Sequence, residues 1–132
     1  MKDMNIAFPM ALARSRAKLG AQLLDRHRPN WHWDVSMNSL DMRSPMKCVL
    51  AQVTGSYSQG RAMTGLNHFQ ATRHGFDVTF LGICWVGYPH LDEAWLEQIQ
   101  MRRERDRQAK EERMRRIDMA AWEAEMKEHV QA

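Results

Sequence analysis

The feature that most constrains the fold of this chain is a stretch of about 40 residues, Leu91 to Val130, without proline or glycine. Residues with a high helix propensity dominate this stretch, so we predict that it forms one continuous helix. At 1.5 Å per residue, such a helix is roughly 60 Å long. Leu91, Trp95 and Ile99 are spaced to share one face, and we expect them to dock residues 91–99 on the rest of the protein.

The middle of the predicted helix, residues 102–113, contains a single apolar residue, Ala109, and we expect it to be exposed to solvent. Ion pairs between residues four apart stabilise an exposed helix by a few tenths of a kcal/mol each. The sequence offers four such pairs, Asp106–Lys110, Arg107–Glu111, Glu111–Arg115 and Glu112–Arg116. We therefore expect this segment to project from the domain as a solvated helix.

Apolar residues return in residues 114–130, the tip of the predicted helix, where they form two stripes. Met114, Ile117, Ala121 and Ala124 form one stripe, and Met119, Trp122, Met126 and Val130 form the other. Apolar side chains at the end of a solvated helix need a partner, and methionine and tryptophan are common at protein contacts. We expect Ile117, Met119, Trp122 and Met126 to bind another protein. The alternative is that the tip folds back onto its own domain.

Arginine is also abundant in this helix, which raises the alternative of a nucleic-acid or ribonucleoprotein binder. Residues 102–116 carry eight basic and four acidic side chains, whereas residues 117–132 carry one basic and four acidic side chains. Acidic residues inside a basic segment weaken phosphate binding, and no leucine zipper follows. Nucleic acid is therefore the second choice of partner. The side chains that would contact it are Arg102, Arg103, Arg105, Arg107, Lys110 and Arg113.

Residues 1–90 are expected to form a small domain of three packed helices, and residues 91–132 the long C-terminal helix. The first helix of the domain is predicted over residues 10–24, because Pro9 suits a first helical turn. Pro29 then ends it, since the residue before a proline disfavours helical dihedral angles.

The second helix is predicted from Pro45 to about Leu66, with Ser44 as its capping residue. Glycine in a helix interior costs about 0.5–1 kcal/mol relative to alanine. We therefore expect this central helix to bend near Gly55 or Gly60.

A short third helix follows, capped by Asn67 and closed by Gly75 at a position that favours a left-handed conformation. Phe76 directly after it is expected to fold back onto the last turn.

Two segments of the domain carry a strand signal. Residues 33–38 alternate apolar and polar side chains, and residues 78–89 are apolar and rich in β-formers. We expect a short two-stranded element at most. An extended loop held by Trp31 and Trp33 is the alternative for the first of these segments.

The residues that carry enzyme or metal chemistry occur here without the spacing such chemistry needs. Cys48 and Cys84 both lie in apolar runs, where a thiol is a packing residue and not a nucleophile. The chain lacks a nucleophile elbow, a P-loop and a dinucleotide-binding glycine motif. We expect no catalytic residues, no metal and no cofactor. The histidines nearest in sequence, which have no cysteine close by, are His27 with His32 and His68 with His74.

Nothing in the chain predicts a membrane location. A bilayer span needs about 18–20 consecutive apolar residues, and the longest apolar runs here are much shorter. Residues 1–16 lack the apolar core of a secretory signal. We therefore expect a cytoplasmic protein with two reduced cysteines.

Residues 19–78 contain the pattern L-L-D-x-x-x-P-x-W, then L-D-M, then C-V-L-x-Q-x-x-G-x-Y, and finally R-H-G-F-D. Its positions here are Leu23, Leu24, Asp25, Pro29, Trp31, Leu40, Asp41, Met42, Cys48, Val49, Leu50, Gln52, Gly55, Tyr57, Gly60, Arg73, His74, Gly75, Phe76 and Asp77. In this pattern residues 19–78 resemble a family of small accessory proteins from phages of actinobacteria. The resemblance implies a phage product that acts in an infected bacterium or is carried in the virion. It brings no catalytic residue with it.

Together these patterns predict a mainly α protein with a three-helix domain and a long C-terminal helix. The function that we expect is that of a non-catalytic phage accessory protein, which binds a host or phage protein or a second copy of itself. A structural component of the virion is a further alternative.

Overall fold

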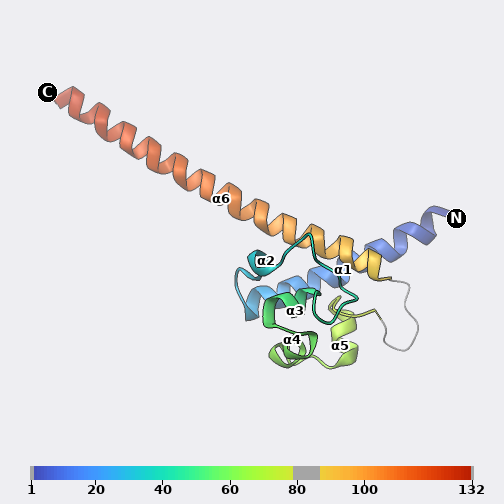
Figure 1. Cartoon of the computed structure of the whole chain (residues 1–132). Helices are drawn as coiled ribbons and strands as arrows, with labels where there is room; N and C mark the ends of the chain where they lie inside the picture. Colours follow the sequence, from blue (N-terminus) through green and yellow to red (C-terminus); the bar gives the residue numbers. More distant parts are fainter. Residues whose placement is uncertain (1, 79–86, 132) are drawn as a thin grey trace. The chain divides into compact units, whose positions relative to one another are not determined.

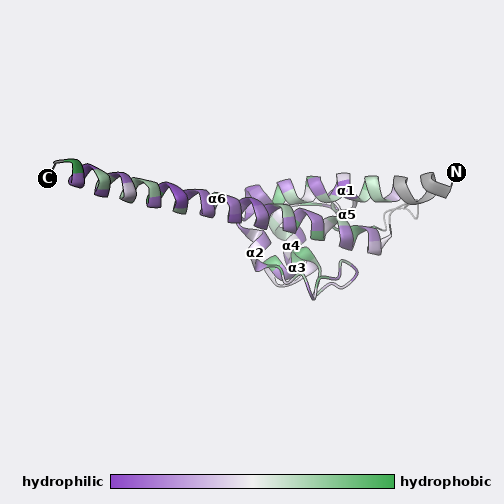
Figure 2. Cartoon of the chain, turned by 90° about the horizontal axis from the view of Figure 1, so that it is seen from above, coloured by the Kyte–Doolittle hydropathy of each residue, from purple (hydrophilic) through white to green (hydrophobic). Residues whose placement is uncertain are grey.

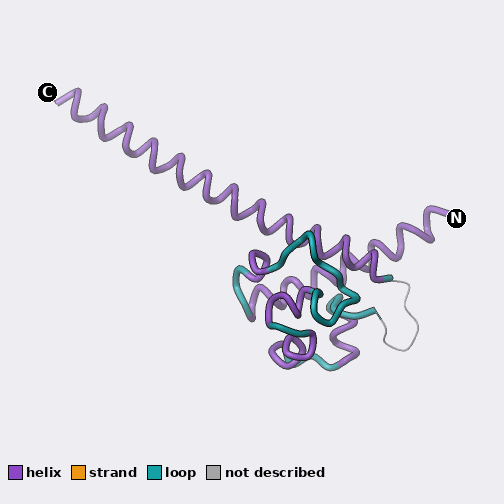
Figure 3. The backbone as a smooth tube through the Cα atoms, in the orientation of Figure 1, coloured by secondary structure: helices purple, strands orange, loops and turns teal. Residues whose placement is uncertain are grey.

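The computed structural model of the chain describes residues 2–78 and 87–131, and it is mainly α (Figure 1). Its helices are α1 (Lys2–His27), α2 (Trp31–Asp34), α3 (Val49–Thr54), α4 (Tyr57–Thr64), α5 (His68–Arg73) and α6 (Tyr88–Gln131). The described residues contain no strand (Figure 3). The chain divides into two compact units, residues 1–100 (the core unit) and residues 101–132 (the tail unit). The predicted class and the long C-terminal helix are confirmed.

The first helix is longer at its N-terminal end than the sequence predicted. α1 begins at Lys2, and Pro9 lies inside it instead of in its first turn. Proline removes one backbone hydrogen bond, but its fixed φ is helical, so the residues before it continue the helix. The end of α1 at His27 agrees with the stop expected at Pro29.

The strand expected at residues 33–38 is wrong. Asn30 adopts a left-handed conformation with φ of 68°, and a single helical turn, α2, follows it. Trp31 in this turn is fully buried, and its indole Nε1 donates to Asp25 Oδ1 at 2.8 Å. Trp33 is 53% exposed, whereas Trp31 is the tryptophan of this segment that packs into the core. The proposed partner segment, residues 78–89, lies largely outside the described residues.

The central helix is broken into two. Ser44 Oγ accepts backbone hydrogen bonds from a turn and not from a helix, and Cys48 is the residue that caps α3. Gly55, with φ of 116°, then ends α3, and the Ser56 side chain caps α4. The glycine expected to bend the helix therefore interrupts it, because a positive φ cannot continue a right-handed helix. This break gives the domain more helices than the three expected.

The two halves of the broken helix pack closely because of a second glycine. A Cβ atom at Gly60 would lie 2.5 Å from Cβ of Leu50. α4 therefore packs this closely on α3 because residue 60 has no side chain. α5 forms as predicted. Asn67 and Gln70 make a reciprocal capping box, and Gly75 takes the left-handed conformation, with φ of 75°.

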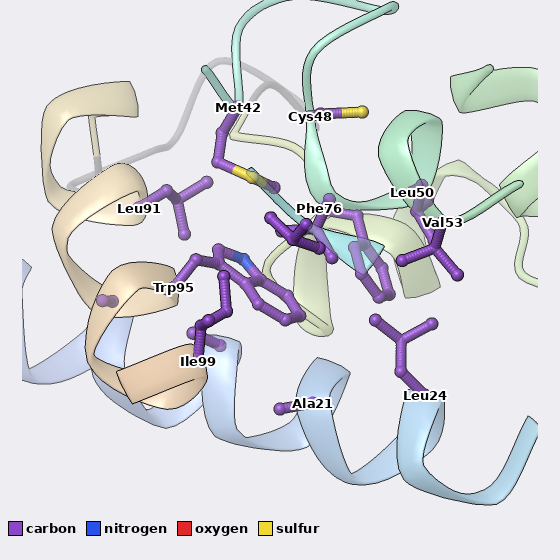
Figure 4. Packing of buried hydrophobic residues seen from close by; sticks show 14 of the residues in the cluster. Ala21, Leu24, Met42, Cys48, Leu50, Val53, Phe76, Leu91, Trp95 and Ile99 are labelled. Carbon is purple, nitrogen blue, oxygen red and sulfur yellow. The ribbon is translucent and has the colours of Figure 1, made fainter. Parts of the chain in front are cut away.

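Trp95 of α6 lies at the centre of the hydrophobic core (Figure 4). Its ring stacks on Phe76 at a centroid distance of 5.2 Å and meets Trp31 edge-on at 5.8 Å. Its Nε1 donates to the carbonyl of Gly75 at 2.7 Å. Leu91 and Ile99 are also fully buried, so the first turns of α6 belong to the core as predicted.

Many residues that carry the family resemblance are core residues. The buried hydrophobic ones are Leu24, Trp31, Met42, Cys48, Val49, Leu50 and Phe76. The quoted pattern therefore contains many residues of the core and no residue of α6.

Candidate partner-binding surface

The tail unit exposes most of its apolar side chains. Every residue from 107 to 130 is exposed, and all of them lie on the single helix α6. Figure 2 shows hydrophobic residues returning toward the C-terminal end of α6 after a hydrophilic stretch. The large ones, with their exposed fractions, are Met114 (53%), Ile117 (61%), Met119 (55%), Trp122 (56%), Met126 (46%) and Val130 (81%).

Helical geometry divides these side chains between two faces. Met119, Trp122 and Met126 follow each other by three and four residues and share one face, which we call the Trp122 face. Met114 and Ile117 lie on another side of the helix with Ala121 and Ala124, which we call the Ile117 face. The four residues expected to bind one partner are therefore not on one face, because Ile117 lies apart from the other three.

The Trp122 face has the composition of a protein-binding surface. Tryptophan presents a large rigid ring with few rotatable bonds, and methionine adapts its shape to an irregular partner. Such side chains usually lie in a core, as Trp95 does in this protein. Met119, Trp122 and Met126 each expose about half of their surface on this helix. They therefore leave apolar area that a partner can cover.

The arginine-rich part of α6 forms ion pairs along the helix. Arg107 pairs with Glu104, through Nε to Oε2 at 2.9 Å, and with Glu111, through Nη1 to Oε1 at 2.6 Å. Arg116 pairs with Glu112 at 2.6 Å. Hydrogen bonding and charge attraction from Arg107 lower the pKa of Glu104. The predicted pairs Arg107–Glu111 and Glu112–Arg116 are thus present, and Glu104 adds one that was not predicted.

The six side chains expected to contact nucleic acid differ in their surroundings. Arg102 is only 8% exposed, and Arg103 is half-buried. Arg107 lies between two carboxylates, and Arg105 pairs with Asp106 at 3.5 Å. Lys110 and Arg113 are exposed. Neutralised and buried guanidinium groups bind phosphate less well than open ones, so these surroundings count against nucleic acid as the partner.

The core unit contains one polar cluster that the sequence did not reveal. The buried Asp77 accepts from the hydroxyls of Tyr57 and Tyr88, each at 3.3 Å, and lies 3.4 Å from Nε2 of His68. Burial and the nearby carboxylate raise the pKa of Tyr57 to about 12. Nothing local in the sequence links positions 57, 77 and 88, and only the fold brings these side chains together.

Asp77 and its two tyrosines line a cavity of about 120 Å³, together with Met42 and Phe76 among other residues. Cavities that hold small-molecule ligands are usually about 300–1,000 Å³. The tyrosine hydroxyls and the carboxylate satisfy each other, so the arrangement stabilises the fold and offers little room for a substrate.

The described parts of the chain contain no cluster of metal-binding side chains, and the cysteine among them is buried. Cys48 is buried, and burial raises the pKa of its thiol, which disfavours the reactive thiolate. Cys84 lies outside the described residues. No group of three or more metal-binding side chains occurs in residues 9–78 and 87–130. None of the helices described combines the length and apolar character that a bilayer span requires.

Comparison of the chain with protein-family models, with curated proteins and with solved structures finds no match.

Proposed function

We propose that this chain is a non-catalytic phage accessory protein that binds another protein, of host or phage origin, through the Trp122 face of α6. The observation that carries the proposal is the exposure of Trp122 (56%) between Met119 and Met126. The phage origin is supported by the resemblance of residues 19–78 alone. The bacterial cytoplasm is the proposed place of action, and the virion is the alternative.

The binding step that we propose is the docking of a preformed helix into an apolar groove. α6 is already helical, so little backbone entropy is lost on binding. Trp122 fills the centre of the contact, and Met119 and Met126 pack on either side of it. A central tryptophan of this kind contributes at least about 2 kcal/mol to many interfaces.

The absence of catalysis in this proposal is supported by the surroundings of the reactive residues. The Cys48 thiol is buried and its pKa is raised. The cavity beside Asp77 is small, and its polar groups bond each other.

The test is affinity capture of the tagged chain from phage-infected actinobacterial cells, with and without nuclease. We expect one dominant protein that survives nuclease, is lost with Trp122→Ala and is retained with Trp33→Ala. Trp33 is the matched control, because it is 53% exposed but belongs to the core unit.

Two outcomes would contradict the proposal. Equal loss with both tryptophan variants would show that the Trp122 face is not the binding surface. Retention that collapses with nuclease, and that charge reversal at Arg103 and Arg105 abolishes, would replace the proposal with nucleic-acid binding.

A further inference from the structure

We infer that the Ile117 face of α6 pairs with the same face of a second copy of this chain, with the two helices antiparallel. This face is separate from the Trp122 face. The inference therefore stands or falls independently of the proposed function.

The Ile117 face extends beyond its four apolar residues in both directions. Spacings of three and four residues alternate along it, which is the pattern by which two helices bury a shared seam. Met114 and Ile117 are 53% and 61% exposed, so the apolar part of the seam is open. In chain order the seam contains Arg107, Lys110, Met114, Ile117, Ala121, Ala124 and Glu128.

The charges at the two ends of the seam select the orientation of the pair. Lys110 precedes the apolar part, and Glu128 follows it. In a parallel pair, each of these side chains would face its own copy, and like charges would repel. In an antiparallel pair, Lys110 of each chain faces Glu128 of the other.

The charge of the whole tail unit favours the same orientation. Residues 102–116 have a net charge of +4 (eight basic, four acidic), and residues 117–132 a net charge of −3 (one basic, four acidic). An antiparallel pair brings the basic half of each helix beside the acidic half of the other. A different protein would need the same change from basic to acidic charge along a helix, whereas a second copy of this chain has it already.

The side chains of the apolar part also match in this register. When Lys110 faces Glu128, Met114 faces Ala124 and Ile117 faces Ala121. Each layer then pairs one long side chain with one small one, so the helix separation stays constant along the seam. A parallel pair would place methionine on methionine at one end and alanine on alanine at the other.

The test is sedimentation equilibrium of the full-length chain over a range of concentrations. We expect a monomer–dimer equilibrium that Ile117→Glu weakens on the order of a hundredfold, because it places two carboxylates in an apolar seam. Gln108→Glu is the control, because it adds the same charge on the opposite side of the helix and should change the dimer constant less than about threefold.

Charge exchange at the ends of the seam tests the orientation. Lys110→Glu alone and Glu128→Lys alone should each weaken the dimer by about tenfold, and the double variant should restore it. Circular dichroism of each variant should show unchanged helix content. A chain that stays monomeric, a dimer that persists in Ile117→Glu, or a double variant without recovery would each overturn the inference.

Discussion

Two tryptophans on α6 show how differently the core unit and the tail unit use the same residue. Trp95 is fully buried, stacks on Phe76 and donates to the Gly75 carbonyl. Trp122 is 56% exposed on the same helix. The difference arises because the core unit supplies apolar residues from several segments, whereas a single helix cannot bury its own side chains. Apolar residues of the tail unit are thus available for a partner.

Replacement of these two tryptophans should give the largest difference in stability between the core unit and the tail unit. Trp95→Ala removes a ring from the centre of the core together with its hydrogen bond. It should lower the free energy of unfolding by about 3–5 kcal/mol. Trp122→Ala should change it by less than about 0.5 kcal/mol. Urea unfolding followed by circular dichroism measures both, and similar losses for the two variants would refute the division of roles.

Addition of a single methyl group to the core unit should have the next largest effect on stability. A Cβ atom at Gly20 would lie 2.1 Å from the carbonyl oxygen of His74 and 2.7 Å from the Trp95 ring. Gly20→Ala should therefore destabilise the chain by about 1–3 kcal/mol, although alanine favours helices. Thermal unfolding measures the loss. An unchanged or higher melting temperature would mean that α1 does not pack closely on these residues.

The comparison also explains which parts of the fold the sequence predicted. α6 and α5 have local signals, namely an uninterrupted run of helix formers and the Asn67 cap, and both formed as expected. The first half of the domain has weaker signals, because the helix break at Gly55 and the turn at Asn30 depend on backbone conformations that tertiary packing selects.

The candidate surface was predictable in part for the same reason. Exposure of Trp122 follows from the lack of apolar residues in the preceding segment, which the sequence shows directly. The Asp77 cluster was not predictable, since its tyrosines come from positions that only the fold brings together.

The polar cluster of the core unit should make stability depend on pH in alkaline solution. The pKa of Tyr57 rises from an ordinary value of 10 to about 12, so the folded chain keeps a proton that the unfolded chain releases. The contribution of this tyrosine to the free energy of unfolding is fully present below pH 10 and is lost as the pH rises toward 12. Urea unfolding at several pH values should show the decline, and Tyr57→Phe should reduce it. An equal decline in the variant would contradict the assignment.

The smallest expected effect concerns the ion pairs of the tail unit. Arg107 lowers the pKa of Glu104 below its ordinary value of 4.5, so this pair supports the helix above that pH and is lost as the pH falls through the lowered value. Glu104→Gln should slightly reduce the helix content measured by circular dichroism at neutral pH. The reduction should shrink in high salt, which screens exposed ion pairs. A salt-independent difference would indicate another cause.

The central claim is that the Trp122 face binds a partner while the core unit maintains the fold. The most direct test is the affinity of the captured protein, once purified, for the wild-type chain and for Trp122→Ala and Trp33→Ala, measured by calorimetry. We expect a dissociation constant at least about thirtyfold higher for Trp122→Ala, and a change below about twofold for Trp33→Ala. Equal affinities for Trp122→Ala and the wild-type chain would contradict it.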